Sequence, residues 1–366
     1  MTHVDEVRTV GVEDLTEFAV RVLVAAGATT DAAAVCADVF IHADLGGTDT
    51  HGVVRLGQYA EALIRGRVSG TARPEVVADC GAVLAIEANN CLGPVALCRA
   101  TDIAVAAAAT HGVAVVAVRG SNHAGGMSWY TERAAESGMF ALVLTGSTKP
   151  MVAPSNGAAP FLGTNAVAYG VPAGSSTLGF DASTSMVSRS KLEAYRRAGR
   201  RLPEGWALGP AGEPAVDPGE VIDGIDSLAG HSILPFGGSD SEHKGFGVGL
   251  LVELLCGPLA GARWGRRQPG SRPDGVGHFV LCLDIGALGA PAEDVERRVS
   301  EFCAELRTTP PADKEIPVRA PGDRRRGCAE RRGREGIPVP VSLLAELDQV
   351  AARTGVAPLW NRALCD

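Results

Sequence analysis

Residues 112–145 read GVAVVAVRGSNHAGGMSWYTERAAESGMFALVLT. An apolar run, GVAVVAV, leads through a polar segment with two glycines into a helical pattern, and a second apolar run, MFALVLT, follows. The order strand, helix, strand is most simply a right-handed parallel crossover, which predicts an α/β fold. His123 then lies beyond the carboxyl end of a strand, in the crevice where open α/β sheets bind ligands.

On either side of this stretch the pattern differs. Residues 12–26 and 31–45 have apolar positions three and four apart, which is typical of amphipathic helices, and Thr30 can cap the second helix. Beyond about residue 73, strand-like and helical segments alternate. The other expected elements are a strand at 83–87, a helix at 94–111, an apolar helix at 245–260, a strand at 278–285, a helix at 291–307 and a final helix at 341–354.

The composition excludes several classes of protein. The 366 residues carry a net charge of -8, which does not attract nucleic acid or an anionic membrane. No segment reaches the roughly 20 clean apolar residues of a membrane span, and the N-terminus lacks the basic and apolar regions of a signal peptide. The nine cysteines include no C-x-x-C pair. They indicate reduced residues of a cytoplasmic protein, and neither a disulfide framework nor a zinc site.

The segment DTHGVVRLGQY at 49–59 is the first candidate for a functional site. If a helix begins near Gly52, Arg55 and Tyr59 lie four residues apart on one face, and His51 lies at the helix start. A guanidinium presented in this way suits bidentate capture of a carboxylate. The alternative is a helix-capping segment with a solvated arginine.

His123 is the second candidate. Histidine is the common acid–base residue near neutral pH. The start of a helix disfavours the imidazolium, so a neutral donor or acceptor is expected there. Gly125 and Gly126 allow a ligand to approach the backbone closely. The alternative is that Asn122 and His123 only cap the helix.

Four small polar loops form the third candidate. Such loops bind phosphate or ribose through backbone and hydroxyl groups, although ordinary turns have the same composition. The Rossmann fingerprint G-x-G-x-x-G, the P-loop and the G-x-S-x-G element of hydrolases are absent from the sequence. Together, the loops around one sheet indicate a site of dinucleotide size. They read TGSTKP at 145–150, LGTNA at 162–166, DASTS at 181–185 and SEHKG at 241–245.

An arginine-rich run, RAPGDRRRGCAERRGREG, occupies 319–336. A nucleic-acid-binding arm is one interpretation of such a run. In a net-acidic chain a flexible, solvated loop is the preferred interpretation, and a contact with a cofactor phosphate lies between the two.

Six segments, in order along the chain, resemble those of a known family. They are DTHGVVRLGQY, RGSNHAGG, GTNAVAYGVP, DASTS, LPEGWALGPAGEPAVDP and HKGFGVGLLVELLCGPLAG. They resemble the malate/L-lactate dehydrogenase family of the non-Rossmann type, which includes L-sulfolactate and ureidoglycolate dehydrogenases and the piperidine-2-carboxylate ketimine reductases. The resemblance extends over about residues 10–355.

This resemblance implies an α/β fold. A three-layer α/β/α mixed-sheet nucleotide-binding domain is expected, with a helical domain built from both chain ends. The implied division is an N-terminal helical part at 1–75, a central domain at 76–308 and a C-terminal segment at 309–366. Family members are dimers or higher assemblies with the active site near the subunit interface, so a homodimer is expected.

Roles for single residues are also implied by the resemblance. His123 would be the acid–base residue, Arg55 would hold the substrate carboxylate, and His51 would lie beside the nicotinamide or the substrate. The turn at 321–324 corresponds to another family segment near the nucleotide. The residues implied to line the cofactor cleft are Ser121, Ser147, Thr164, Asn165, Asp181, Ala182, Ser183, His243, Lys244 and Gly245.

Three departures from the family pattern concern the substrate more than the reaction. Thr50 stands where many relatives have serine, and Ala166 stands where proline usually follows GTN. In TGSTKP, where many relatives read T-N-S and small residues, Lys149 places a cation near the cleft. It binds the substrate, lowers the pKa of His123 or points to water.

The expected function is hydride transfer between NAD or NADP and a small anionic substrate, without a metal ion. Reduction of the C=O bond of a 2-oxo acid is the first choice. Reduction of a cyclic C=N bond is the close alternative, because both use the same hydride donor. A third alternative is a nucleotide-binding homologue without catalysis, against which His51, His123 and Arg55 together argue.

Overall fold

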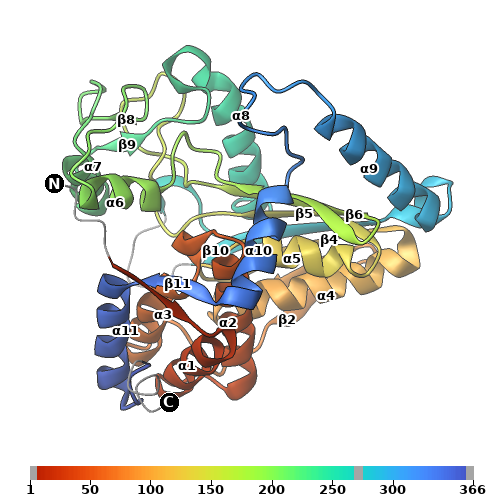
Figure 1. Ribbon diagram of the computed structural model, residues 1–366, viewed down its shortest axis with the longest axis horizontal. Coiled ribbons are helices and arrows are strands. Elements are labelled where there is room, and N and C mark those ends of the chain that lie inside the picture. The colour runs from red at the N-terminus through yellow and green to blue at the C-terminus, as the bar shows by residue number, and fades with distance from the viewer. Residues whose placement is uncertain (1–5, 268–274, 360–366) are drawn as a thin grey trace.

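The computed structural model describes residues 6–267 and 275–359, and a seven-stranded mixed sheet lies at its centre (Figure 1). The strand order is β2-β3-β4-β10-β5-β6-β7; β3 and β4 run parallel, and the other neighbouring pairs of this sheet run antiparallel. The strands are β2 (Glu75–Asp79), β3 (Val83–Glu87), β4 (Val113–Ser121), β5 (Met139–Thr145), β6 (Ala166–Ala173), β7 (Ser176–Ala182) and β10 (Val276–Asp284).

The stretch 112–145 forms strand β4, helix α5 (Ser128–Ala135) and strand β5, so the expected order of elements is confirmed. β4 and β5 are parallel to each other, but β10 lies between them and pairs antiparallel with both. Val280 on β10 pairs with Val116 on one side and with Val143 on the other. The crossover therefore passes over one intervening strand, which comes from much later in the chain.

Helices cover both faces of the sheet. On β5, Val143 is buried against the helices α4 (Gly93–His111) and α5, whereas its neighbour Leu144 is buried with Val252 of α8 (Gly238–Cys256). Successive side chains of a strand point to opposite faces, so α4 and α8 cover opposite sides, as Figure 1 shows. The predicted three-layer α/β/α arrangement is confirmed.

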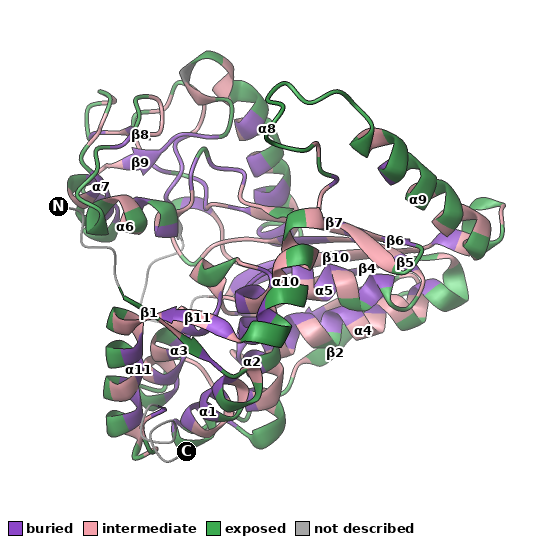
Figure 2. Ribbon diagram, viewed as in Figure 1, coloured by how far each residue is buried: buried purple, intermediate pink, exposed green. Residues whose placement is uncertain are grey.

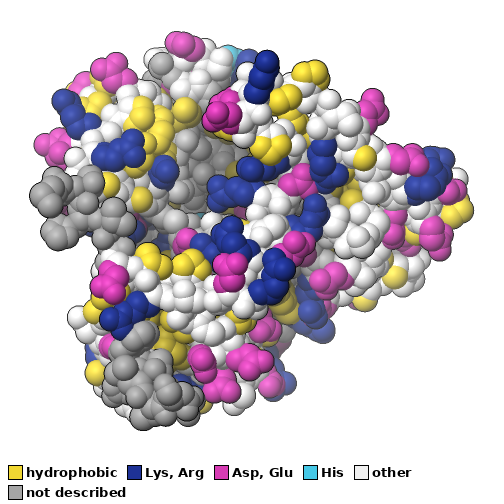
Figure 3. Space-filling model, in the orientation of Figure 1, with side chains coloured by type: hydrophobic (Ala, Val, Ile, Leu, Met, Phe, Trp, Pro, Cys, Tyr) yellow, Lys and Arg dark blue, Asp and Glu magenta, His cyan; other side chains and the backbone are white. Residues whose placement is uncertain are grey.

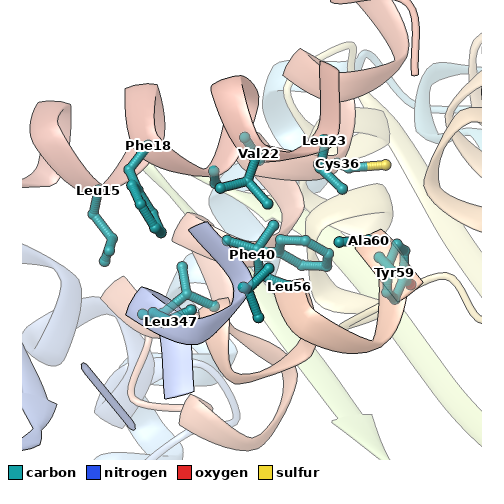
Figure 4. Close-up of a cluster of buried hydrophobic side chains, with 14 of the residues drawn as sticks. Leu15, Phe18, Val22, Leu23, Cys36, Phe40, Leu56, Tyr59, Ala60 and Leu347 are labelled. Carbon is teal, nitrogen blue, oxygen red and sulfur yellow. The ribbon is translucent and has the colours of Figure 1, made fainter. Parts of the chain in front are cut away.

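A helical domain is built from both ends of the chain. Phe18, Phe40 and Leu56 from the N-terminal helices pack in one core with Leu347 from the last helix (Figure 4). Burying each such side chain contributes about 1.5–3 kcal/mol, so this core joins the two ends. The helical domain is confirmed, and the division at 75 and 308 stays a prediction. Its elements are α1 (Val12–Ala25), α2 (Thr30–Leu45), α3 (Leu56–Ile64) and α11 (Val341–Thr354), with β1 (Val7–Val10) paired to β11 (Ile337–Pro340).

The segments 146–165 and 183–237, which flank β6 and β7 in the chain, form a lobe that was not predicted. Its own core contains Leu192, Ile222 and Ile233, all buried. The elements of the lobe are α6 (Arg189–Arg197), α7 (Pro218–Asp226) and the short paired strands β8 (Ala207–Leu208) and β9 (Ser232–Ile233). The lobe lies over one end of the sheet in Figure 1, opposite the helical domain.

Three predictions about the helices differ from the structure. The side chain that caps α2 is that of Thr29 rather than Thr30. Helix α8 begins at Gly238 and has a kink at Ser241, where φ is -139° and ψ is 20°, so its regular part starts a few residues before the predicted position near 245. The arginine-rich run is not a flexible loop, because it contains helix α10 (Asp323–Glu335), which packs against α2.

Helix α9 (Ala292–Arg307) packs against β6 and is exposed along much of its length (Figure 2). Figure 2 also shows that buried residues concentrate on the sheet and on the helix faces that meet it. Among the residues that the structure describes, no helix combines the length and the apolar character needed to cross a membrane.

Candidate active site

A cavity of about 1380 Å³ opens where the sheet, the helical domain and the lobe meet. Figure 3 shows a hollow near the middle of the molecule, with Lys and Arg side chains around it. Several segments that are distant in the sequence converge on this cavity, as the sequence predicted. The predicted site residues that line it are His51, Arg55, His123, Ser147, Lys149, Thr164, Asp181, Ala182 and Ser183.

His123 lies in the loop between β4 and α5. Because α5 begins only at Ser128, the start of a helix is not what keeps this imidazole neutral. Burial is the main cause of a pKa well below the usual range for His123. The nearby His51, Arg55 and His278 lower that pKa further. The ring is therefore uncharged near neutral pH.

Tyr59 of α3 contacts His123 on the side away from the cavity. Its hydroxyl lies 2.9 Å from Nδ1 and 2.5 Å from the carbonyl oxygen of His123. The N–H of Gly125 also points at Nδ1, at 3.3 Å. Gly125 has a φ of +73°, and a Cβ there would lie 2.6 Å from Val39, so this turn requires glycine. No sequence signal linked Tyr59 to His123, because the two residues belong to separate elements.

His51 stacks on His123, with ring centroids 5.9 Å apart and ring planes 14° from parallel. The hydroxyl of Thr50 lies 3.0 Å from Nδ1 of His51. Burial, and then the charge of Arg55, lowers the pKa of His51 to about 4. Two uncharged imidazoles therefore lie side by side in the wall of the cavity.

The segment 49–55 forms two short 3-10 turns, and α3 begins at Leu56 rather than near Gly52 as predicted. Asp44 of α2 supports this segment, because its carboxylate accepts a hydrogen bond from the N–H of Val53 at 2.8 Å. A Cβ at Gly52 would lie 1.7 Å from the Asp44 carboxylate, so only glycine allows the approach. The turns place His51 and the end of the segment at the cavity.

Arg55 occupies the end of the second turn and lines the cavity. Its Nε donates to the carbonyl of Thr50 at 2.8 Å, and one terminal nitrogen donates to the hydroxyl of Ser190 at 2.7 Å. A third hydrogen bond, at 3.4 Å, goes to the side-chain carbonyl of Gln58. None of these three acceptors is a carboxylate, so the charge of Arg55 remains available to an anionic ligand.

Lys149 belongs to the lobe, lines the cavity and forms an ion pair with Asp226 of α7. Arg189 donates to the same carboxylate, at 2.8 Å from its second terminal nitrogen, and to Glu193 at 3.1 Å. The hydrogen bond from Arg189, followed by that from Lys149, lowers the pKa of Asp226 to about 2. Lys149 therefore does not point freely to water, and the lowered pKa of His123 has other causes.

Hydroxyl groups line the part of the cavity that follows β5. The N–H of Thr164 donates to the hydroxyl of Ser147 at 3.0 Å, and the two hydroxyl oxygens are 3.2 Å apart. Asp181, at the end of β7, accepts a hydrogen bond from the N–H of Ser128 at 2.9 Å and so caps α5. Burial raises the pKa of Asp181. Such groups can bind the ribose and phosphate oxygens of a nucleotide.

The start of α10 supplies a basic part of the wall. Arg324 lines the cavity, and its guanidinium reaches the carbonyl of Gly47 at 3.4 Å. Arg325 pairs with Glu132 and lies 3.0 Å from Nε2 of His42. Burial lowers the pKa of Arg325 to about 10, which leaves it charged near neutral pH. The turn at 321–324 thus borders the cavity, next to the proposed place of the nucleotide, as the family resemblance implied.

Ser121 was predicted to line the cofactor cleft, but it is fully buried beneath the cavity. Its hydroxyl lies 2.9 Å from Nε2 of His278 on β10. Nδ1 of His278 lies 2.8 Å from the hydroxyl of Thr145, which lines the cavity. The buried His278 therefore joins the ends of β4, β10 and β5 just below the site, and the apolar strand pattern around it concealed this role.

Four other predicted residues do not line the cavity. The amide of Asn165 is buried and donates to the carbonyl of Gly249 at 2.9 Å and to Glu253 at 2.7 Å. His243 and Lys244 are exposed on α8, because the chain runs on as a helix after the kink at Ser241 and does not turn into the cleft. The four residues are Asn165, His243, Lys244 and Gly245.

The cavity fits a dinucleotide together with a small acid. Ligand pockets commonly measure about 300–1000 Å³, and a cavity of about 1380 Å³ leaves room for both molecules. Hydroxyl and backbone groups suit ribose, the arginines of α10 suit phosphate, and the imidazole pair lies beside Arg55. Within residues 6–267 and 275–359, no group of three or more His, Cys, Asp or Glu side chains is placed to hold a metal ion.

Comparison with known proteins agrees with this geometry. The malate dehydrogenase of Pyrococcus abyssi is 33% identical over 352 residues, which cover 95% of each chain. The Delta(1)-pyrroline-2-carboxylate reductase of Ancylobacter novellus is 32% identical over 90% of this chain and 94% of its own. The crystal structure of malate dehydrogenase from Entamoeba histolytica superposes with a TM-score of 0.91 at 25% identity, covering 96% of this chain and 99% of that one.

The model of the malate/L-lactate dehydrogenase family matches residues 10–348, which is nearly the whole chain. Relatives in this family are named as dehydrogenases or reductases of small carboxylates, one of them as an NADP(+) enzyme. The chain belongs to the malate/L-lactate dehydrogenase family and is an NAD(P)-dependent oxidoreductase that acts on small carboxylates.

Proposed function

We propose that the cavity is the active site, in which His123 transfers the proton and Arg55 binds the carboxylate of the substrate. One observation supports this assignment most directly. The buried imidazole and the guanidinium come from separate elements and line the same cavity, and the hydrogen bonds of the guanidinium leave its charge available. His51, stacked on His123, lies beside the reacting atoms.

The nucleotide is proposed to lie along the hydroxyl-lined wall. The residues assigned to it are Ser147, Thr164, Asp181, Ala182 and Ser183, with Arg324 and Arg325 available to phosphate groups. When bound, the nicotinamide supplies hydride in reduction and accepts it in oxidation. Both NAD and NADP remain candidates, and the cytoplasmic location stays a prediction.

The proton moves at Nε2 of His123. In reduction this atom gives a proton to the oxygen or nitrogen of the substrate, and in oxidation it accepts one. A nearby anion favours the charged form of an imidazole. Substrate binding at Arg55 therefore favours proton uptake by His123, whose environment otherwise keeps it neutral.

The charges around the lobe favour an anionic substrate. Four cations face the cavity there against two carboxylates, which leaves two positive charges in excess. Lys149 is one of the four, and its partner Asp226 fixes its position. Reduction of a 2-oxo acid such as oxaloacetate, the oxidised counterpart of malate, is therefore the first choice. The cations are Arg55, Lys149, Arg189 and Lys191, and the carboxylates are Glu193 and Asp226.

Reduction of a cyclic imine carboxylate is the second candidate. The chain is 32% identical to the Ancylobacter novellus reductase and 33% identical to the Pyrococcus abyssi malate dehydrogenase. These identities favour the two candidate reactions about equally. Both substrates carry a carboxylate for Arg55 and accept hydride at the carbon next to it. His123 would protonate oxygen in one case and nitrogen in the other.

The chain is also proposed to form a homodimer through α8. This helix exposes an apolar row, with Val248 at 39%, Leu251 at 54% and Leu254 at 44% exposure, and Leu259 beyond its end at 72%. Exposed apolar rows of this kind are typical of protein interfaces. His243 and Lys244 lie in the first half of the same helix, so the proposal places these two predicted site residues near a second copy.

Absorbance at 340 nm tests the proposal. NADH and NADPH are each offered with oxaloacetate, pyruvate and Δ1-pyrroline-2-carboxylate. Consumption of the reduced cofactor with an oxo acid supports the first choice, and consumption with the imine alone supports the second. No consumption with any combination, in a folded protein that binds NADH, would contradict both candidate substrates.

A further inference from the structure

The hydroxyl of Tyr59 has two acceptors within reach and one proton to donate. It lies 2.9 Å from Nδ1 of His123 and 2.5 Å from the carbonyl oxygen of the same residue. A phenol donates a single hydrogen bond and can accept others. Burial raises the pKa of Tyr59 well above its usual range, so the phenol keeps its proton.

These distances allow two complete hydrogen-bond arrangements without movement of heavy atoms. When His123 is neutral with its proton on Nε2, the Tyr59 hydroxyl and the N–H of Gly125 both donate to Nδ1. When His123 is an imidazolium, Nδ1–H donates to the Tyr59 oxygen, and the Tyr59 hydroxyl turns to the carbonyl oxygen of His123. The N–H of Gly125 then donates to the Tyr59 oxygen. Rotation of one O–H bond separates the two arrangements.

The other groups that face His123 all oppose its charge. His51 and Arg55 lie on the side of the helical domain, and His278 lies below on β10; each lowers the pKa of His123. Cys36 of α2 lies near the Tyr59 hydroxyl as a neutral thiol. A buried N–H without an acceptor costs about 1–3 kcal/mol. An acceptor for Nδ1–H therefore stabilises the imidazolium form of His123.

We propose that Tyr59 is a positioning residue that serves His123 in both protonation states, donating to Nδ1 of the neutral ring and accepting from Nδ1–H of the imidazolium. The kinetic consequence rests on the proposed function of His123 as the proton-transfer residue. The hydrogen bonds of Tyr59 do not depend on that function, so they can be tested in the protein without cofactor or substrate.

The test compares Tyr59→Phe with Tyr130→Phe. Tyr130 is a matched control, because it is also fully buried and its hydroxyl donates to the carbonyl of the adjacent residue, Ala124, at 2.6 Å. It makes no hydrogen bond to the His123 ring among those the structure gives. Both variants lose one buried phenolic hydrogen bond in the same loop, and only the Tyr59 variant loses one to Nδ1.

The first readout is the ¹⁵N spectrum of histidine-labelled, cofactor-free protein at pH 8, with the His123 signals assigned by their loss in His123→Asn. We expect the Nδ1 signal to move toward that of an imidazole nitrogen without a hydrogen bond in Tyr59→Phe, and to stay in place in Tyr130→Phe. An unchanged Nδ1 signal in folded Tyr59→Phe, or equal shifts in both variants, overturns the proposal.

The second readout is the pH dependence of kcat for reduction. Reduction needs the imidazolium, so the rate falls as the pH rises through the pKa of His123. Without the acceptor at Nδ1 this fall is expected at a pH lower by about one unit in Tyr59→Phe, and at the unchanged pH in Tyr130→Phe. A fall at the same or a higher pH in Tyr59→Phe overturns the proposal. If no substrate is reduced at all, the proposed function fails, and the ¹⁵N spectrum alone decides the role of Tyr59.

Discussion

His51 and His278 are held neutral by burial, which lowers the pKa of each to about 4. In the unfolded chain a histidine binds its proton at a pH near 6.5. The stability that these neutral rings contribute is therefore complete above about pH 6.5 and is lost as the pH falls toward 4. We expect the free energy of unfolding in urea to fall by about 1.4 kcal/mol per pH unit for each ring below pH 6.

His278→Gln provides the control for this pH dependence. Glutamine keeps a donor and an acceptor for Ser121 and Thr145, but it does not titrate. The variant should lose stability less steeply between pH 6 and pH 4 than the parent protein, by about one proton. Equal slopes in the two proteins would show that His278 does not stay neutral in the folded chain.

Arg55 is expected to bind the substrate carboxylate through its planar fork. Lysine keeps the charge but cannot form two parallel hydrogen bonds. Arg55→Lys should therefore raise KM for the oxo acid by about tenfold to 10²-fold and Arg55→Ala by more, while KM for the cofactor changes little. An equal rise of both KM values in these variants would assign Arg55 to the nucleotide or to the fold instead.

Among single residues, those in short local motifs were predictable. His51, Arg55 and His123 each stand in a segment whose residue types suit their chemistry, and all three line the cavity. The contacts of Tyr59 with His123 and of Asp226 with Lys149 were not predicted, because the partners lie 64 and 77 residues apart in the chain. Only the folded backbone places such residues in contact.

At the scale of elements, the two turns that carry His51 and Arg55 depend on one glycine. A Cβ at Gly52 would overlap the Asp44 carboxylate, which supports the turns from α2. Gly52→Ala should lower the free energy of unfolding by several kcal/mol, on the order of an overpacked core substitution, and should reduce kcat/KM even where the protein remains folded. Thermal unfolding and the 340 nm assay measure the two effects.

Gly327→Ala is the matched control for this substitution. Gly327 lies inside α10, and a Cβ there would meet no atom within 4 Å. Alanine favours a helix interior by about 0.5–1 kcal/mol over glycine, so this variant should be slightly more stable and fully active. Comparable losses in the two variants would rule out the close contact at residue 52 as the cause.

Elements with a strong local pattern were predicted well, including the final helix at 341–354, whose bounds agree with α11. Which elements lie next to one another in the folded protein was not predicted. The position of β10 between β4 and β5 results from pairing between distant strands. The helix in the arginine-rich run was missed because its weak apolar pattern predicts solvent rather than packing against α2. The SEHKG segment was read as a turn from its composition.

At the scale of the whole molecule, the cavity exists because three separately packed parts meet around one end of the sheet. The α/β fold was predicted from the order of strands and helices, and the helical domain from both ends through the family resemblance. The lobe was not predicted, since its parts come from two stretches of chain that only the folded backbone brings together. It supplies Lys149, Arg189 and Asp226, so the substrate end of the site was the least predictable.

The proposed dimer is tested at this scale by its mass in solution. Leu251→Asp places a charge in the exposed apolar row of α8 and should convert a dimer into a monomer, as measured by light scattering after gel filtration. Leu288→Asp, at a leucine that is 63% exposed outside α8, should leave the mass unchanged. A monomeric parent protein, or a dimer that survives Leu251→Asp, would remove α8 as the interface.

The most direct test of the proposed chemistry is the turnover of His123→Gln, measured at 340 nm with the substrate and cofactor that the parent protein uses. Cofactor affinity, followed by NADH fluorescence, and the unfolding temperature establish that the variant is folded and loaded. If His123 transfers the proton, kcat falls by about 10²–10⁴-fold while both controls stay unchanged. A fall of less than about tenfold in such a variant would contradict that role.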